Sequence, residues 1–274
     1  MGIYSFTFSP TGTSAKVLRG INAGISETSG SAVDFNDLTC EAVARKTFDA
    51  DDVVVVSSPV YGGKVAPVAK SRLDGLAGNG ARCVVVAVYG NRAFENAVCD
   101  FAAFMSEHGF VVCGGAAFVG EHSYSTAAMP IAQGRPDSRD IDDAKAFGRE
   151  IGVRICGGSF RAIDCGALSD EPSPAGAMEN FKSFVADYQR QQAEAPRVYL
   201  PQLDESLCNG CGICYAVCPT GAITEGMDGV DPSRCIKCCA CVKSCAQGAR
   251  VLESPFARPL WENFGARKSP VWLL

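Results

Sequence analysis

The chain has 274 residues and a formal net charge of −5 at pH 7. A mildly acidic chain without a basic patch has no footprint for nucleic acid, so nucleic acid is not an expected partner. No apolar run approaches the roughly 20 residues of a membrane span, and the N-terminal MGIYSFTFSP lacks the regions of a signal peptide. Fifteen cysteines without signs of secretion indicate a reducing compartment, so we expect a cytoplasmic protein.

Residues 1–157 alternate short apolar runs with stretches of helical periodicity. The predicted strands are Ile3–Phe8, Ser31–Phe35, Val53–Val56, Cys83–Tyr89 and Phe110–Val119. The predicted helices are Thr13–Ile25, Lys64–Leu76, Ala93–Glu107 and Ser138–Ile155. Repeated βα units with continuously apolar strands indicate an α/β fold whose parallel sheet is covered by helices on both faces. Such sheets bind ligands at the carboxyl ends of their strands, so functional residues are expected in the loops there.

The loop after the first predicted strand collects hydroxyl groups at the start of a helix. It reads Ser9-Pro10-Thr11-Gly12-Thr13-Ser14. Free backbone N–H groups and the helix dipole favour an anion at this position. The loop contains no lysine, which disfavours a nucleoside triphosphate and favours a single phosphomonoester. An ordinary capped helix start is the alternative interpretation, because Ser and Thr are common N-caps.

Two more loops follow strands at the same edge of the sheet. The third predicted strand leads into Pro59-Val60-Tyr61-Gly62-Gly63, and the fourth ends in Tyr89-Gly90-Asn91-Arg92. An aromatic ring flanked by proline and two glycines can lie flat against a planar ligand. The three loops together would supply a phosphate cradle and two walls of a flat slot.

These three loops give the N-terminal part of the chain its resemblance to flavodoxins. The stretch Ser9-x-Thr11-Gly12-x-Ser14 matches the flavodoxin phosphate loop, with serine at the last position where threonine is usual. The other two loops match those that sandwich the flavin ring in that family. The resemblance implies bound FMN and a doubly wound sheet of five parallel strands in the order 2-1-3-4-5.

The resemblance also implies roles for the loop residues. Thr11, Thr13 and Ser14 would donate hydrogen bonds to the FMN phosphate, and Gly12 would allow the backbone to approach it closely. Tyr61 would stack on one face of the flavin ring.

The remaining flavin contacts are assigned in the same way. Gly62 or Gly63 would turn a peptide toward N5 of the reduced flavin, and backbone groups around Gly90–Arg92 would face the pyrimidine edge. Arg92 either stabilises negative charge at N1 and O2 or is a solvated surface arginine. His122 is either a proton source near the flavin or a loop histidine that is merely hydrogen-bonded.

Residues 166–202 are predicted to be a linker. Ala167–Pro174 is rich in small, acidic and proline residues, which indicates a loop. Ala175–Ala193 has the apolar spacing of one amphipathic helix. Ala195–Gln202 is a candidate hinge.

Two cysteine runs with the same spacing come after the linker. They are Cys208-x2-Cys211-x2-Cys214-x3-Cys218-Pro219 and Cys235-x2-Cys238-x2-Cys241-x3-Cys245. This spacing holds a pair of [4Fe–4S] clusters, in which the fourth cysteine of each run ligates the other run's cluster. The expected ligand groups are Cys208, Cys211, Cys214 and Cys245 for one cluster and Cys235, Cys238, Cys241 and Cys218 for the other.

Zinc and disulfides are the alternatives for these thiols. A zinc ion takes four ligands and does not require a repeated run of four cysteines. A disulfide framework needs an oxidising compartment, of which the sequence shows no sign. Cys239, between two expected ligands, is either a spare small residue or a substitute ligand. The segment Leu203–Glu253 resembles the bacterial two-cluster ferredoxins over its whole length.

The whole chain resembles the flavodoxin–ferredoxin fusion proteins of anaerobes known as EFR1 family ferredoxins. Gly120-Glu121-His122-Ser123-Tyr124 and Gly134-Arg135-Pro136-Asp137 also match that group. The predicted segments are a flavodoxin-like FMN domain at 1–165, the linker at 166–202, a small α+β two-cluster ferredoxin domain at 203–253 and an aromatic tail at 254–274. The tail either packs on the chain's own domains, docks a partner or covers the flavin.

Two functions remain open. The first is an electron carrier that passes electrons between two [4Fe–4S] clusters and FMN, and so couples one- and two-electron partners, with a redox protein as its partner. The second is an FMN-dependent reductase of a small acceptor, such as a quinone or nitro compound, fed by its own ferredoxin domain. The sequence has no GxGxxG nicotinamide fingerprint of the dinucleotide-binding type, which favours the carrier.

Overall fold

The computed structural model describes residues 1 to 274 and divides the chain into two compact units. The first unit contains Met1–Glu121, Gly134–Glu171 and Lys268–Leu274. The second unit contains His122–Gln133 and Pro172–Arg267. Neither unit is one continuous segment, so the chain leaves the first unit and returns to it twice.

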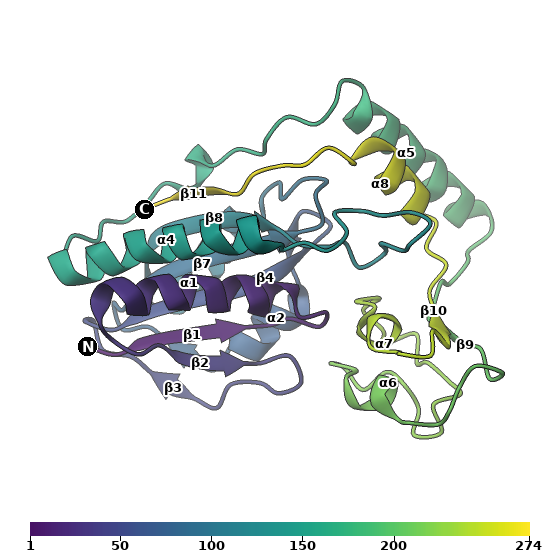
Figure 1. Cartoon of the computed structure of the whole chain (residues 1–274), viewed down its shortest axis with the longest axis horizontal. Helices are drawn as coiled ribbons and strands as arrows, with labels where there is room; N and C mark the ends of the chain where they lie inside the picture. The colour runs from purple at the N-terminus through teal and green to yellow at the C-terminus, as the bar shows by residue number, and fades with distance from the viewer. The chain divides into compact units, whose positions relative to one another are not determined.

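The first unit is built on a sheet with five parallel strands. They are β1 (Ile3–Thr7), β2 (Asp34–Asp37), β4 (Val53–Tyr61), β7 (Arg82–Tyr89) and β8 (Val111–Val119). Their order across the sheet is β2-β1-β4-β7-β8 (Figure 1), which is 2-1-3-4-5 when the five are numbered along the chain. The predicted flavodoxin-like strand order is therefore confirmed. It places the carboxyl ends of β1, β4 and β7 next to one another.

Shorter strands extend this sheet. β5 (Lys64–Val65) forms an antiparallel hairpin with the end of β4, and β11 (Val271–Leu273) pairs antiparallel with β8. The sheet is therefore larger than the five predicted strands. A separate pair is formed by β3 (Lys46–Thr47) and β6 (Leu76–Ala77).

Helices cover the sheet and enclose a large apolar core. α1 (Thr13–Ser29) and α4 (Ser138–Gly157) lie side by side on one face (Figure 1), while α3 (Ala97–Glu107) packs against β7 and β8. α2 (Pro67–Leu73) follows β5, and a 3₁₀ turn, η1, spans Cys165–Ala167. Glycine at the contact of α1 with α4 allows close packing, because a Cβ at Gly148 would clash with the backbone oxygen of Ile21. The core side chains include Leu18, Ile21, Val55, Val86, Phe118 and Phe147.

The second unit has short elements and smaller apolar clusters. α5 (Ala177–Glu194) confirms the predicted amphipathic helix and packs against α8 (Ala257–Asn263). Phe181 meets Phe264 at 5.5 Å between ring centroids and forms the centre of this cluster. β9 (Gln202–Leu203) pairs antiparallel with β10 (Arg250–Val251), and the short helices α6 (Ile213–Ala216) and α7 (Ala240–Lys243) lie between them in the chain.

The predicted aromatic tail is divided between the units. α8 belongs to the second unit, and β11 belongs to the first. In β11, the Trp272 ring stacks on Phe118 with a centroid distance of 6.3 Å, and its Nε1 donates to the Glu150 carboxylate at 3.3 Å. The tail thus packs on the chain itself, which was one of its predicted interpretations. None of the helices combines the length and apolar character that crossing a bilayer requires.

Candidate cofactor sites

The first candidate site begins in the loop between β1 and α1. Gly12 precedes the helix with a φ of 81°, a left-handed conformation that favours glycine. Ser9 closes this loop, because its Oγ accepts a hydrogen bond from the Ala15 N–H at 2.9 Å. The Ser9 N–H in turn donates to Thr39 Oγ1 at 2.8 Å. Ser9 therefore shapes the loop and accepts one N–H of the helix, but the N-cap itself is Gly12 and not the Ser or Thr of the capped-start interpretation.

The same loop leaves a buried polar group without a protein partner. The Ser14 side chain is 0% exposed, and its Oγ makes no hydrogen bond. A buried hydroxyl without a partner is costly, so such groups usually await a ligand or water. A Cβ at Gly12 would meet nothing within 4 Å, so the backbone there is open to a ligand. Together with the helix start, these features fit the phosphate group predicted for Thr11, Gly12, Thr13 and Ser14.

The β4–β5 hairpin forms the second loop at this edge of the sheet. Tyr61 pairs with Lys64, and the turn between them uses Gly62 and Gly63 with φ of 60° and 78°. A Cβ at Gly62 would meet nothing within 4 Å, whereas a Cβ at Gly63 would clash with the Glu95 side chain. Gly62 is therefore the position with open backbone, whereas Gly63 faces the Glu95 side chain. The half-buried residues of this loop are Pro59, Val60 and Tyr61.

The third loop differs from the predicted wall of a slot. Tyr89 is only 3% exposed, and its ring packs edge-on against Phe94 at 5.6 Å between centroids. Burial raises the pKa of Tyr89, and the nearby charges of Asp170 and Glu171 raise it further. The Tyr89 ring is therefore part of the core. Beyond the half-buried Gly90, Asn91 is 2% exposed and takes a left-handed φ of 68°.

Arg92 is paired within the protein rather than solvated. Its Nη1 lies 2.5 Å from Glu95 Oε1, and its side chain is 17% exposed. The Lys268 ammonium donates to the Arg92 backbone oxygen at 2.7 Å. Burial lowers the pKa of Lys268, and the charges of Asp170 and Glu171 oppose that change. Sequence reasoning missed Lys268, because it lies 176 positions from Arg92 in the chain.

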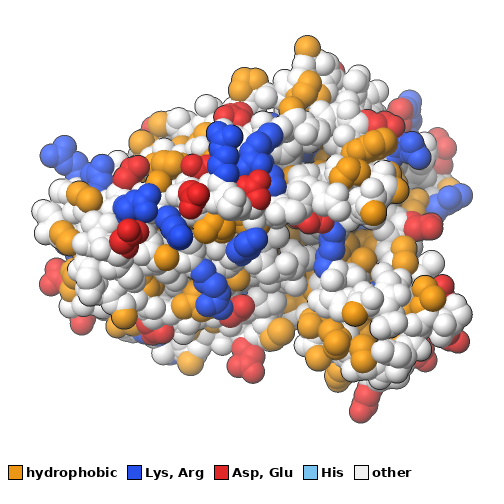
Figure 2. All heavy atoms as spheres, viewed as in Figure 1, with side chains coloured by type: hydrophobic (Ala, Val, Ile, Leu, Met, Phe, Trp, Pro, Cys, Tyr) orange, Lys and Arg blue, Asp and Glu red, His pale blue; other side chains and the backbone are white.

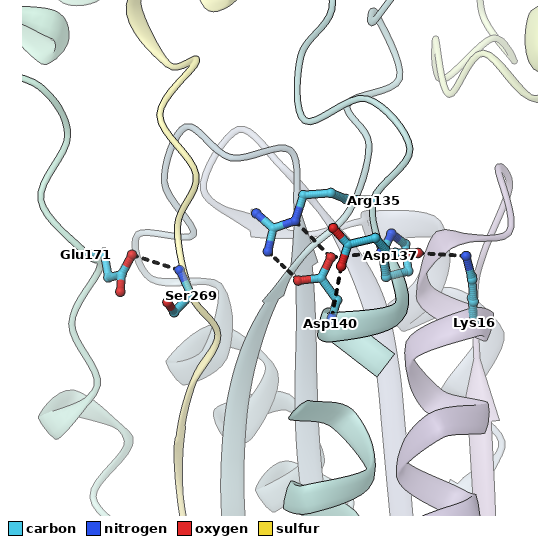
Figure 3. A network of polar contacts seen from close by, with 7 residues as sticks. Lys16, Arg135, Asp137, Asp140, Glu171 and Ser269 are labelled. Atoms are coloured by element: carbon cyan, nitrogen blue, oxygen red, sulfur yellow. Dashed lines mark hydrogen bonds and ion pairs between the residues drawn. The ribbon is translucent and has the colours of Figure 1, made fainter. Parts of the chain in front are cut away.

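Two acidic residues of the predicted linker make hydrogen bonds within the first unit, and one of them holds the third loop. The N–H groups of Phe94 and Glu95 donate to the Asp170 carboxylate at 2.8 Å and 3.0 Å. The Ser269 N–H donates to Glu171 Oε2 at 2.8 Å, as Figure 3 shows. The first residues of the predicted linker therefore belong to the first unit. In the sequence, the adjacent acidic residues Asp170 and Glu171 were the feature that could have indicated these contacts.

A buried ion pair orders the loop before α4 (Figure 3). Arg135 Nε donates to Asp140 Oδ2 at 2.9 Å, and its Nη2 lies 2.5 Å from Oδ1. Asp140 also accepts the Asp137 N–H, and Asp137 caps α4 in return. Lys16, in the first turn of α1, donates to the Pro136 oxygen at 2.6 Å. These contacts fasten the starts of α1 and α4 to each other beside the loop between β1 and α1.

His122 belongs to the second unit. Its Nδ1 accepts the Tyr124 N–H at 3.0 Å, and the two ring centroids are 5.0 Å apart. The His122 N–H donates to the Ile131 oxygen at 3.1 Å. The structure thus supports the interpretation of a hydrogen-bonded loop histidine.

The second candidate site lies among the cysteines of the repeated runs. The first cavity is lined by Cys208, Cys211, Cys214 and Cys245. The second cavity is lined by Cys218, Cys235, Cys238 and Cys241. Each cavity takes three thiols from one run and the fourth from the other, which is the grouping that the spacing predicts. No three His, Cys, Asp or Glu side chains converge on the position of a single metal ion.

The local backbone explains how three thiols of a run reach one cavity. The short helices α6 and α7 each start after a left-handed residue, Gly212 with φ of 73° and Cys239 with φ of 62°. A second left-handed turn precedes each of them, at Gly210 and Lys237. Cys239 occupies the place of a glycine, and burial raises the pKa of its thiol. It lines the second cavity beside the four expected ligands.

The fourth thiol of each run is surrounded by backbone donors. Burial raises the pKa of Cys218, but the N–H groups of Thr220, Ala222 and Ile223 outweigh burial and hold it below its ordinary value. The pKa of Cys245 is lowered in the same way, with burial again opposed by the N–H groups that come after it in the chain. These donors favour the thiolate, which is the form that binds metal. Burial raises the pKa of the other thiols of the second cavity, Cys235, Cys238 and Cys241.

Comparison with known proteins agrees with this site. Residues 201–224 match the family model "4Fe-4S binding domain". The second unit contains a 4Fe–4S ferredoxin module. Over 66 residues the chain is 63% identical to the ferredoxin-type protein NapF of Escherichia coli K12, covering 24% of this chain and 33% of that protein. Over 136 residues it is 29% identical to a tetrathionate reductase subunit of Salmonella typhimurium, covering 45% of this chain and 51% of that protein.

The curated relatives are thus matched over about half of their length or less. Among solved structures, a flavodoxin from the domain Archaea is 16% identical with a TM-score of 0.41, and the match covers 57% of this chain and 99% of that one. A flavodoxin from Streptococcus pneumonia is 19% identical with a TM-score of 0.40, covering 56% of this chain and 99% of that one. The flavodoxin-like description of the first unit rests on its strand order.

Proposed function

We propose that this chain is an electron-transfer protein that binds FMN in the first unit and two [4Fe–4S] clusters in the second. The observation that carries the proposal is the crossed grouping of the eight cysteines around two cavities. One four-thiol site would use one run, whereas the crossed arrangement is the one that places two cubanes next to each other.

The proposal assigns particular residues to each group, and the geometry of the loops and cavities supports the assignment. Thr11, Gly12, Thr13 and Ser14 would bind the FMN phosphate, with Ser9 shaping the loop around them. Tyr61 and the open backbone at Gly62 would face the flavin ring. The lining cysteines of the first and second cavities would ligate one cluster each.

The chemistry of these groups gives the function. Iron–sulfur clusters pass single electrons and FMN stores one or two, so a protein with both couples one- and two-electron partners. The chain's own contribution would be to place four thiols around each cluster, to favour the thiolate of Cys218 and Cys245 through backbone N–H groups, and to fix the flavin phosphate. The shared motifs further support membership of the EFR1 family of flavodoxin–ferredoxin fusion proteins.

A redox protein is the proposed partner. Figure 2 shows hydrophobic side chains gathered on the surface over α6 and α7, with acidic side chains at its margin. In and just before α6, the exposed apolar residues Leu207, Ile213 and Tyr215 are 50%, 43% and 47% exposed. Ile213 also lines the first cavity. Exposed apolar side chains near a cluster suit a transient protein contact.

The alternative function is a flavin-dependent reductase of a small acceptor. It requires an open pocket over the flavin lined by the Glu121–Arg135 loop. The ends of that loop are closed on themselves, because the Glu121 N–H donates to the Arg135 oxygen at 2.7 Å and Glu121 Oε2 accepts the Gly134 N–H at 3.0 Å. No feature of the loop favours a small acceptor, so the carrier is the better-supported function.

Cofactor analysis of protein purified without oxygen tests the proposal. About eight irons, about eight acid-labile sulfides and one FMN per chain are expected for two cubanes and one flavin. About four irons would contradict the two-cluster assignment, and a denatured supernatant without flavin absorbance would contradict FMN.

Turnover assays separate the carrier from the reductase. The reduced protein is mixed with quinones, nitro compounds or oxidised two-cluster ferredoxin, and reoxidation is followed optically. Fast reoxidation by ferredoxin with insignificant rates for every small acceptor supports the carrier. Fast turnover of a small acceptor that is lost in Tyr61→Ala would show the reductase instead.

A further inference from the structure

The repeated cysteine runs are equivalent in spacing, but the residues after them differ. In the first run, Cys218 is followed at the fifth position by Ile223. In the second run, Cys245 is followed at the fifth position by Arg250. Ile223 lines the second cavity and Arg250 lines the first. The two cavities therefore differ at one equivalent position, where one has an aliphatic side chain and the other has a guanidinium group.

Arg250 is buried with most of its donors unused. The residue is 2% exposed, and only its Nη2 has a protein acceptor, the Met227 backbone oxygen. Its Nε and Nη1 are buried and make no hydrogen bond. The carboxylate of Asp228 senses its charge, but that side chain is exposed and is bonded to Thr224 at 2.8 Å. A buried guanidinium group with two donors that lack acceptors is strongly unfavourable.

A bound cluster would supply what Arg250 lacks. A cubane ligated by four thiolates is an anion with hydrogen-bond acceptors on its sulfurs, and it gains one more negative charge when it is reduced. A buried cation stabilises the reduced state more than the oxidised state and so raises the reduction potential. Ile223 offers neither charge nor donors to the second cavity. The two clusters would be chemically the same, so a difference between their reduction potentials would come from the residues around them.

We propose that Arg250 donates from Nε and Nη1 to the cluster of the first cavity and makes it the more easily reduced of the two. This inference rests on the proposed function, because it requires both clusters. Arg250 is a positioning and tuning residue, not a ligand.

Three substitutions in the full-length, cluster-loaded protein test the role. Arg250→Leu removes charge and donors, Arg250→Gln keeps donors without charge, and Arg250→Lys keeps charge with different geometry. Ile223→Leu is the matched control, because it changes the equivalent side chain of the other cavity without adding charge. Midpoint potentials are measured by stepwise anaerobic reduction with paramagnetic resonance detection. Contact-shifted cysteine resonances, assigned along the sequence, identify which cluster each potential belongs to.

The expected result is specific to one cluster. Arg250→Leu should lower the reduction equilibrium constant of the first-cavity cluster at least tenfold, which is about 59 mV for one electron. Arg250→Gln should lower it less, Arg250→Lys least, and Ile223→Leu should leave both potentials unchanged. Because the group is buried, the shift should persist at high salt.

Other results would overturn the inference. An unchanged potential of the first-cavity cluster in Arg250→Leu and Arg250→Gln, with full iron content, would show that Arg250 only holds the Met227 loop. Equal shifts of both clusters would contradict its assignment to the first cavity. If Arg250→Leu loses iron, the midpoint potentials of Arg250→Gln and Arg250→Lys test the inference instead. Wild-type protein with fewer than two clusters would instead contradict the proposed function, whatever the variants do.

Discussion

The two units differ in the size of the apolar core that each one has inside it. The first unit has a continuous core formed by α1, α4 and the strands between them. The second unit has two small clusters, and one of them consists largely of Cys214, Ile223 and Cys241. Small modules that bury little apolar surface usually need metals or disulfides for stability. We therefore expect the first unit to hold its fold without a cofactor, whereas the second depends on its clusters.

Removal of iron should give the largest effect, because only the second unit is expected to need its clusters for folding. After anaerobic treatment with an iron chelator, backbone amides of residues 203–253 should lose protection from hydrogen exchange, because their thiols lose the ions that hold them. Amides of β4 and β7 should keep their protection. Exchange measured by mass spectrometry on digested protein provides the readout. Retained protection in the second unit would show that its fold does not need the clusters.

Loss of a single ligand should remove about half of the iron. Cys241→Ser replaces a thiol of the second cavity and should destabilise one cluster while the other remains. Cys239→Ser changes the neighbouring thiol and should leave the iron content near that of the wild type. Iron and acid-labile sulfide analysis measures both. If Cys239→Ser loses as much iron as Cys241→Ser, Cys239 is a ligand after all.

A substitution in the core of the first unit should lower the free energy of unfolding without changing the iron content. Phe118→Ala removes a buried ring that contacts Phe147 and Trp272, and should lower the free energy of unfolding by about 3–5 kcal/mol. Val111→Ala, at an exposed position of the same strand, should change it by roughly 0.5 kcal/mol or less. Urea unfolding followed by circular dichroism gives both values. Iron content should stay the same in both variants, and a loss of iron in Phe118→Ala would contradict the independence of the two units.

The smallest expected effect concerns the phosphate loop. Ser14→Ala should weaken FMN binding about tenfold, because the lost hydrogen bond is worth roughly 1–1.5 kcal/mol. The same change should not lower the stability of the flavin-free protein, since it removes a buried hydroxyl that has no partner. Ser26→Ala, on the same helix about 18 Å away, is the control. Equilibrium dialysis and thermal unfolding give the two readouts. Unchanged affinity in Ser14→Ala would exclude Ser14 from the site.

Local patterns made much of this predictable. The buried valine run at Val53–Val56 and the hydroxyl-rich loop after β1 place the sheet and its binding edge, because both signals lie within a few neighbouring residues. The crossed cavities are predictable from cysteine spacing alone, since the run length fixes where each thiol points. Such features depend on short-range geometry, which a single sequence contains.

Long-range contacts account for what was missed. β11 has three residues, too few for a periodic signal, and its partner β8 lies far away in the chain. Lys268 and Asp170 meet the third loop only after the fold has formed. Tyr89 was predicted to line the flavin slot, because the sequence does not show whether a side chain at the end of a strand points into the core or toward a ligand. For β11, Lys268 and Asp170 the deciding neighbour is distant in sequence, whereas Tyr89 turns inward onto the nearby Phe94.

The position of β11 has a consequence for synthesis on the ribosome. The sheet of the first unit gains its last strand from residues 271–273, which emerge after every cysteine of the second unit. Until then β8 is an edge strand with unpaired backbone groups, the kind of edge that invites association between nascent chains. Iron–sulfur assembly on the emerging cysteines can therefore begin while the sheet of the first unit still lacks β11. A chain that stops before β11 would expose the edge of β8, which is prone to association.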